Sequence, residues 1–135
     1  MVASDQCPGL TDFTEFSLLG HTDTITSLAW HPDGTVLASA SSDHTIQVWD
    51  VQSGLDNFFG DRHNDGVNDV AWHPGGTIFA SASADHSVGI WNANWSVSSI
   101  SITTLYGHTG EVQAVAFSPL ESFKFLASQY AHPLW

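Results

Sequence analysis

Basic residues are almost missing from this chain. Its 135 residues contain two Lys or Arg, Arg62 and Lys124, against fourteen Asp and Glu, which gives a formal net charge of −12. Nucleic acids and anionic lipid surfaces attract Lys and Arg, so the charge argues against either as a partner. It is compatible with a basic protein partner, and equally with a simple role in solubility. The acidic residues are spread along the chain, so no acidic tail is predicted.

Cysteine and long apolar runs are also scarce. Cys7 is the only cysteine, so no disulfide can form within the chain, as expected in a reducing compartment. The opening stretch, MVASDQCPGL, has neither the basic start nor the apolar core of a signal peptide. No apolar run approaches the roughly 18 residues that a membrane span needs. These absences predict an intracellular protein, cytoplasmic or nuclear.

An internal repeat dominates what is present. Shifted by 42 positions, residues 21–50 fall on residues 63–92 without a gap, and 15 of the 30 aligned pairs are identical. A third, poorer copy begins at Gly107-His108 and ends at Trp135. A period of about 40–45 residues with a Gly-His opening and a Trp-Asp close is typical of propeller-blade repeats.

Short alternating runs between tight turns predict strands, and no segment shows the helical period. The expected strands cover residues 13–19, 25–30, 35–41, 45–49, 67–72, 77–83, 87–91, 97–105 and 111–117. HPDG at 31–34 and HPGG at 73–76 are predicted turns, because Pro presets φ and Gly accepts a positive φ. Residues 50–57 are interpreted as a linker. Trp30 and Trp72, which end strands, are expected to pack between neighbouring units.

The motifs resemble those of the WD-repeat β-propeller family over roughly residues 13–135. The matching residues are Gly20-His21, SSDHTIQVW and Trp49-Asp50, then His63, SADHSVGIW and Trp91-Asn92, and more faintly Gly107-His108 and Leu134-Trp135. The resemblance implies an all-β fold of about three four-stranded antiparallel blades, each with an outer strand before the Gly-His. Repeats would lie at about 13–50, 55–92 and 97–135, after a loose end at 1–12. Such a partial propeller is not closed by itself, because closure takes four or more blades.

The family also holds each blade together with a buried hydrogen-bonded set of His, Ser or Thr, Asp and Trp. By motif match the members here are His21, Ser41, Asp43 and Trp49, and again His63, Ser83, Asp85 and Trp91. A chain of bonds from Asp through His and Ser to the Trp indole would leave no buried polar group unpaired.

The same His-Ser-Asp content invites an enzymatic interpretation, which we reject. The set recurs at identical spacing in two copies, as a structural staple does and a catalytic site does not. No Cys-x-x-Cys or His-x-x-x-His pair and no Gly-rich phosphate loop is present. We therefore expect no catalytic residues, no metal site and no cofactor.

The third copy departs from the pattern. PLESF replaces the Pro-Gly turn, the turn Asp is missing, and Pro133 stands where a strand would donate a hydrogen bond. We therefore expect the third blade to lack the hydrogen-bonded set and its last strand.

An incomplete ring exposes sheet edges and apolar blade faces. The chain is then part of a longer propeller, or assembles with itself as a homo-oligomer, or completes the ring of another protein. The resemblance implies a non-catalytic scaffold or adaptor for protein–protein interaction. The alternative is a truncated or purely structural fragment with no partner site of its own.

A partner site is expected on the rim that carries the loops around the Gly-His pairs and the Asp turns. The candidate residues are Asp23, Ser42 and His44 in the first copy, with Asp65, Ala84 and His86 in the second.

Overall fold

The computed structural model describes residues 17–60, 63–93, 102–119 and 126–129, with the backbone alone for 55–59 and 126–129. These residues form β-strands and no helix, which confirms the expected all-β class. The strands are β1 (Ile25–Trp30), β2 (Val36–Ser41), β3 (Ile46–Asp50), β4 (Leu55–Gly60), β5 (Val67–Trp72), β6 (Ile78–Ser83), β7 (Val88–Asn92), β8 (Ile102–Leu105), β9 (Ala114–Phe117) and β10 (Leu126–Gln129).

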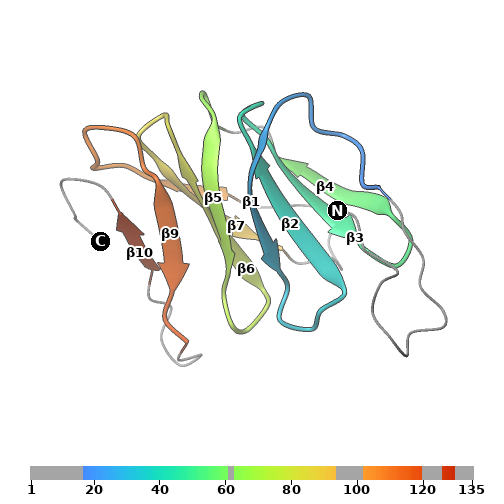
Figure 1. The fold of residues 1–135 in the computed structure, drawn as a ribbon. Coiled ribbons are helices and arrows are strands. Elements are labelled where there is room, and N and C mark those ends of the chain that lie inside the picture. The colour runs from blue at the N-terminus through green and yellow to red at the C-terminus, as the bar shows by residue number, and fades with distance from the viewer. Residues whose placement is uncertain (1–16, 61–62, 94–101, 120–125, 130–135) are drawn as a thin grey trace, which may run out of the picture.

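The strands form three antiparallel sheets in chain order. Blade one has the order β1-β2-β3-β4, blade two has β5-β6-β7-β8, and blade three is the pair β10-β9. Figure 1 shows the blades standing face to face, with β1 beside β5 and β5 beside β9. The result is an open stack rather than a closed ring, as the sequence predicts for a partial propeller.

Tight turns join the strands of each blade. In the HPDG turn, Gly34 N–H donates to the His31 carbonyl at 2.9 Å and His31 N–H donates to the Val36 carbonyl at 2.8 Å. Gly34 has a φ of 79°, a conformation that costs a residue with a Cβ roughly 1–2 kcal/mol. The expected turn at 31–34 therefore forms, and a like turn forms at 73–76.

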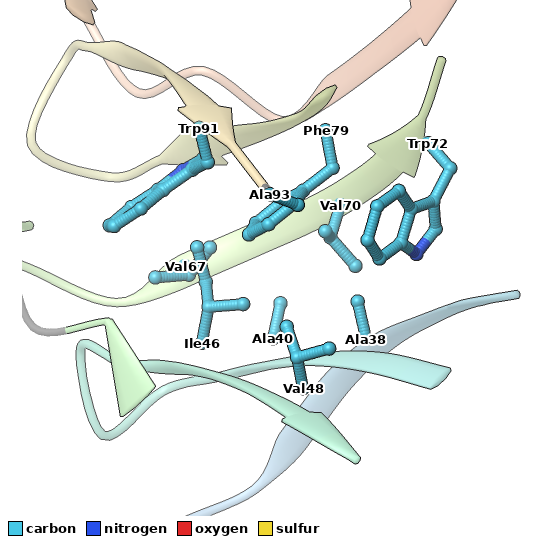
Figure 2. Close-up of a cluster of buried hydrophobic side chains, with 10 residues drawn as sticks. All are labelled: Ala38, Ala40, Ile46, Val48, Val67, Val70, Trp72, Phe79, Trp91 and Ala93. Atoms are coloured by element: carbon cyan, nitrogen blue, oxygen red, sulfur yellow. The ribbon is translucent and has the colours of Figure 1, made fainter. Parts of the chain in front are cut away.

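The main core lies between blades one and two. Small and aliphatic side chains of blade one face the aromatic side chains of blade two (Figure 2). The cluster comprises Ala38, Ala40, Ile46 and Val48 from blade one, and Val67, Val70, Trp72, Phe79, Trp91 and Ala93 from blade two or its end. Alanine on β2 lets the two sheets approach closely enough for the aromatic rings to fill the gap. A second cluster repeats this arrangement between blades two and three, with Ala80, Ala82, Val88, Val112 and Val115 buried.

Polar bonds set the position of each blade on the next. Thr26 Oγ1 donates to the Val67 carbonyl at 2.5 Å, and the Trp72 indole donates to the Ala29 carbonyl at 3.1 Å. One repeat later, Asn68, at the position of Thr26, donates to a main-chain carbonyl of blade three at 2.9 Å. The same strand positions therefore make the contact at both blade boundaries.

Asp69 joins all three blades through one carboxylate. Its Oδ1 accepts from Ser27 Oγ of blade one at 2.7 Å and from the neighbouring Val70 N–H at 2.9 Å. Its Oδ2 accepts from the Val115 N–H of blade three at 3.1 Å. The position is occupied by Ser27 in the first copy, so this bridge is not part of the repeat.

The expected strand at 13–19 does not appear where the structure describes it. Residues 17–19 are not in a strand, and 13–16 lie outside the described residues. The outer strand of blade one is instead β4, which follows β3 and pairs with it from Ile46↔Gly60 to Asp50↔Leu55. A strand before the first Gly-His has no described sheet to pair with, and unpaired backbone groups do not support a strand.

The segment interpreted as a linker therefore contributes to a blade. Only residues 51–54 make the turn, in which Gly54 N–H donates to the Asp50 carbonyl at 2.8 Å with a Gly54 φ of 71°. A short hairpin brings β4 back onto β3, and the run at Phe58-Phe59 lies within that strand. The sequence repeat and the blade are thus out of phase by one strand.

Two further expectations need correction. The strand expected at 111–117 begins at Ala114, because the Val112 N–H donates to the Ser83 carbonyl of blade two at 3.0 Å rather than to a strand of its own blade. Of the two tryptophans expected between blades, Trp72 is 9% exposed but Trp30 is 48% exposed. No described blade covers the face of blade one on which Trp30 lies.

Candidate functional site

The hydrogen-bonded set of blade one forms around the His21 imidazole. His21 Nδ1 lies 2.8 Å from Asp43 Oδ2, and His21 Nε2 lies 2.6 Å from Ser39 Oγ. The Trp49 indole donates to the same Ser39 oxygen at 2.9 Å. A carboxylate only accepts, so in the neutral ring Nδ1 carries the proton and the Ser39 hydroxyl donates to Nε2. The set ties the loop before β1 to β2, to β3 and to the turn between them.

The serine of this set is Ser39, and the prediction of Ser41 is wrong. Trp49 pairs with Leu37 across β2 and β3. Ser39 is the next residue on the same face, whereas Ser41 lies about 7 Å further along the strand. Ser41 Oγ instead holds the turn, where it donates to a loop carbonyl at 2.9 Å and accepts from the Asp43 N–H at 3.1 Å.

Blade two repeats both arrangements. His63 Nδ1 lies 3.0 Å from Asp85 Oδ2, His63 Nε2 lies 2.7 Å from Ser81 Oγ, and the Trp91 indole donates to that oxygen at 2.8 Å. Ser81 therefore takes the place predicted for Ser83. The Ser83 hydroxyl accepts from the Asp85 N–H at 3.1 Å in the turn.

A further hydroxyl in each blade was not predicted. Thr45 donates to Asp43 Oδ1 through its N–H at 2.9 Å and through its hydroxyl. Ser87 donates to Asp85 Oδ1 through its N–H at 2.9 Å and its hydroxyl at 2.5 Å. The sequence signal is a Ser or Thr two residues after the turn Asp, the spacing at which an Asp side chain closes a turn on its own backbone.

These bonds set the ionisation of the two turn aspartates. Burial raises the pKa of Asp43, but hydrogen bonds from Thr45, from His21 and from main-chain N–H groups outweigh it and lower the pKa from 3.8 to about 2. Burial likewise raises the pKa of Asp85, and the matching hydrogen bonds, led by Ser87, lower it to about 2. Both carboxylates are therefore charged acceptors at neutral pH.

The Asp-His-Ser arrangement has the connectivity of a hydrolytic triad but not the access. Ser39 is 1% exposed and Ser81 is fully buried. Each serine oxygen also accepts a hydrogen bond from an indole N–H and is hydrogen-bonded to a histidine nitrogen. A nucleophile must reach a substrate carbon, and these hydroxyls cannot. The geometry suits a staple that holds strands together.

The loops at one end of the blades carry the six predicted rim residues. The loop before β1 and the turn between β2 and β3 meet at the top of Figure 1, and the corresponding segments of blade two lie beside them. Exposed side chains there are Asp23, His44, Asp65 and His86, while Ser42 and Ala84 are half-buried. His44 Nε2 lies 4.0 Å from Asp65 Oδ1, so the rims of the two blades are in contact.

The rim backbone is held in one conformation. His44 and His86 have φ values of 75° and 76°, in the left-handed region that few residues with a Cβ adopt. The Ser42 N–H donates to the Thr24 carbonyl at 2.9 Å, and the corresponding bond in blade two has the same length. The Asp23 carboxylate accepts from the Thr24 N–H at 2.7 Å. The exposed charges are therefore presented at fixed positions.

Within the described residues, no group of three or more His, Cys, Asp or Glu is placed to hold a metal ion. In the same part of the chain, no helix has the length and apolarity to cross a membrane.

Comparison with known proteins finds repeats of one family. The family model described as WD domain, G-beta repeat matches residues 13–50, 57–92 and 99–129. Coronin-7 of Homo sapiens is 51% identical over 43 residues, which are 31% of this chain and 5% of that protein. Probable cytosolic iron-sulfur protein assembly protein Ciao1 of Culex quinquefasciatus is 57% identical over 35 residues, 26% of this chain and 10% of its own. Nuclear distribution protein PAC1 of Coprinopsis cinerea is 49% identical over 37 residues, 27% of this chain and 8% of its own.

Each of these matches covers a tenth or less of the relative. They therefore identify the repeat and not the activity of any one relative. The three family matches, in contrast, cover most of the chain, and the first two each contain one complete set of Asp-His-Ser-Trp bonds. The chain belongs to the WD40 family of repeat proteins.

Proposed function

We propose that this chain is a non-catalytic protein-interaction scaffold that binds a basic partner segment through the rim of blades one and two. WD40 repeats are generally a scaffold for protein–protein interaction. The observation that carries the proposal is the pair of exposed aspartates, Asp23 and Asp65, held at equivalent places on adjacent blades by bonds from their own loops.

The charge of the chain supports a basic partner. A net charge of −12 attracts cationic segments at long range, and fixed surface carboxylates favour encounter with them. The His44 imidazole between the blades lies close to Asp65 and forms part of the same surface. A segment rich in Lys or Arg that crosses the two blades would meet both carboxylates.

Asp23→Asn combined with Asp65→Asn tests the rim. Asparagine keeps a side-chain oxygen that can accept from the loop N–H, so the variant removes charge and preserves the loop. We expect a labelled peptide of alternating Lys and Ser to bind the double variant at least several-fold more weakly, as measured by fluorescence anisotropy at low ionic strength. Binding to the unmodified protein should fall as salt is added.

Asp33→Asn combined with Asp50→Asn is the matched control. These aspartates lie at the opposite end of blade one and also accept from nearby main-chain N–H groups. The control loses the same charge, so it corrects for the change in net charge. If both double variants lose the same affinity, the peptide responds to overall charge and the rim placement is wrong.

A specific observation also favours the second candidate function, a structural unit with no partner site of its own. Along β1, the apolar side chains of Ile25, Leu28 and Trp30 are each about half exposed. Such an apolar surface needs another protein surface rather than a peptide. If both double variants bind the peptide as tightly as the unmodified chain does, the result favours this second function.

We also propose that the protein is intracellular, in the cytoplasm or the nucleus. The relatives named above include a cytosolic assembly protein and a nuclear distribution protein. Imaging of a tagged chain would test this.

A further inference from the structure

The contact between blades one and two centres on one tryptophan and one pair of alanines. Ala29 of β1 pairs with Ala38 of β2. Both belong to the cluster around Trp72, and Figure 2 shows Ala38 opposite its ring. The Trp72 indole also donates to the Ala29 carbonyl at 3.1 Å. A large ring on one blade thus sits against a cross-strand Ala–Ala pair on the other.

The contact between blades two and three has the same parts. Ala71 of β5 pairs with Ala80 of β6. Phe117 of β9 takes the place of Trp72, and both Ala71 and Phe117 pack on the second core cluster. The pattern of an aromatic ring on an Ala–Ala pair therefore holds at both blade boundaries.

Each end of the stack has one half of this contact, the ring or the Ala–Ala pair, and no described blade lies opposite it. Trp30 of blade one stands where Trp72 and Phe117 stand, yet it is 48% exposed. Ala116 of β9 is exposed and pairs with Ala127 of β10, which gives blade three the same Ala–Ala pair in the same register.

The residues around Trp30 complete a leading flank of blade one, defined here by Ile25, Leu28 and Trp30. Ile25 and Leu28 are 48% and 52% exposed, while their counterparts Val67 and Val70 in blade two are 0% and 3% exposed. A small hollow beside this flank is lined by Leu18, Ile25, Leu28, Leu37, Ser39 and Trp49. The flank therefore presents several apolar side chains beside an existing hollow.

Blade three also offers the polar partner for this flank. At the two boundaries between blades within the chain, Thr26 donates to the Val67 carbonyl and Asn68 donates to the Val112 carbonyl. Gln113 occupies the equivalent position in the third copy, is exposed, and has an amide donor. Its matching acceptor is the Ile25 carbonyl, on the leading flank.

We propose that two copies of this chain associate head to tail, with the leading flank of one copy on blade three of the next. Trp30 of the first copy lies on Ala116 of the second, where β9 pairs with β10, and donates its indole N–H to the Ala116 carbonyl. Gln113 of the second copy donates to the Ile25 carbonyl of the first. The contact is heterologous, so it forms a ring if its rotation closes and a longer chain otherwise.

Two features set the strength of this contact. Ser118 stands where His31 and His73 stand, so the bond from His31 Nε2 to the Gly76 carbonyl at 2.9 Å has no counterpart in the contact between copies. The net charge of −12 on each copy opposes association at low ionic strength. We therefore expect reversible association that strengthens as salt is added, the reverse of the salt response expected for peptide binding at the rim.

The experiment measures molar mass by sedimentation and light scattering over a range of protein concentration and salt. The unmodified chain should exceed its monomer mass of 14.6 kDa as either is raised. Trp30→Ala and Ala116→Arg should each raise the dissociation constant at least about tenfold. Tyr106→Ala is the matched control, because Tyr106 is 75% exposed and lies outside both surfaces. Circular dichroism confirms that each variant is folded.

Mixing the two variants separates this arrangement from a symmetric one. The Trp30→Ala chain keeps an intact blade three, and the Ala116→Arg chain keeps an intact leading flank. An equimolar mixture should therefore form a dimer and stop there, although neither variant associates alone. A mixture that stays monomeric, or an unmodified chain that stays monomeric at every concentration, would overturn the proposal. Neither result bears on the rim, whose test uses a different surface.

Discussion

Blades one and two present nearly the same face, but the tryptophan that ends the first strand of each blade is buried only in blade two. Trp72 is 9% exposed and Trp30 is 48% exposed, at positions 42 residues apart in an otherwise matched strand. The difference lies in the neighbour, because blade one covers Trp72 and no described blade covers Trp30. A residue motif specifies the shape of a blade face, but burial of that face depends on what stands opposite.

Truncating Trp72 has the largest expected effect, and truncating Trp30 gives the comparison. Trp72→Ala should lower the free energy of unfolding by about 3–5 kcal/mol, because it leaves a cavity between blades and removes a bond to the Ala29 carbonyl. Trp30→Ala should cost about 1 kcal/mol or less in the monomer. Urea denaturation at low protein concentration measures both. Equal losses would mean that the two faces are equally covered.

Removing the turn aspartate should have the next largest effect. Asp85→Ala leaves the His63, Asn64 and Ser87 donors without their acceptor and should cost about 1–3 kcal/mol. Asp43→Ala should cost a similar amount, because the two carboxylates are enclosed alike, with side chains 8% and 10% exposed. Urea unfolding of both variants measures the two losses. No loss in either would contradict a stabilising role for the hydrogen-bonded set.

The serine correction gives a test of similar size. Ser81→Ala removes the shared acceptor of the Trp91 indole and partner of His63, so we expect a loss of about 1–3 kcal/mol. The indole should also change its environment, which near-ultraviolet circular dichroism would detect. Ser83→Ala should leave the Trp91 signal unchanged, because that serine serves the turn. A change in the Trp91 signal from Ser83→Ala alone would restore the original prediction.

Acid should weaken both blades through the same carboxylates. The pKa of Asp43 and of Asp85 falls from 3.8 to about 2 on folding. The stabilisation from each is therefore fully present above pH 3.8 and is lost as pH falls through about 2. In Asp85→Asn the loss of stability over this interval should be smaller than in the unmodified chain. Denaturation midpoints measured across the interval would show it, and identical slopes would contradict it.

The smallest expected effect concerns the left-handed turn residues. His86→Gly relieves a φ of 76° and should change stability by less than about 1 kcal/mol, in the stabilising direction. His44→Gly relieves the same strain but also removes the contact with Asp65, so its gain should be smaller. Thermal denaturation of the two variants compares them. A larger gain from His44→Gly would mean that this contact contributes nothing.

The sequence predicted most of the strands because each blade repeats its own turn residues and alternation. It did not predict which strand completes a blade, because the repeat starts one strand before the sheet does. It also misplaced the serine of the hydrogen-bonded set. Ser39 and Ser41 share a face, and only the pairing of Trp49 with Leu37 decides which one the indole reaches. Pairing across strands is a property of the folded sheet, whereas turns and alternation are local.

The Asp69 bridge has a consequence for how the chain unfolds. Stacked repeats commonly interact only with their nearest neighbours, so a terminal repeat can fray without disturbing the others. Asp69 accepts from Ser27 of blade one and from the Val115 N–H of blade three. Loss of blade three therefore leaves part of that carboxylate without a partner, right against blade one. Through this one side chain, the unfolding of blade three is coupled to blade one, beyond the contacts between nearest neighbours.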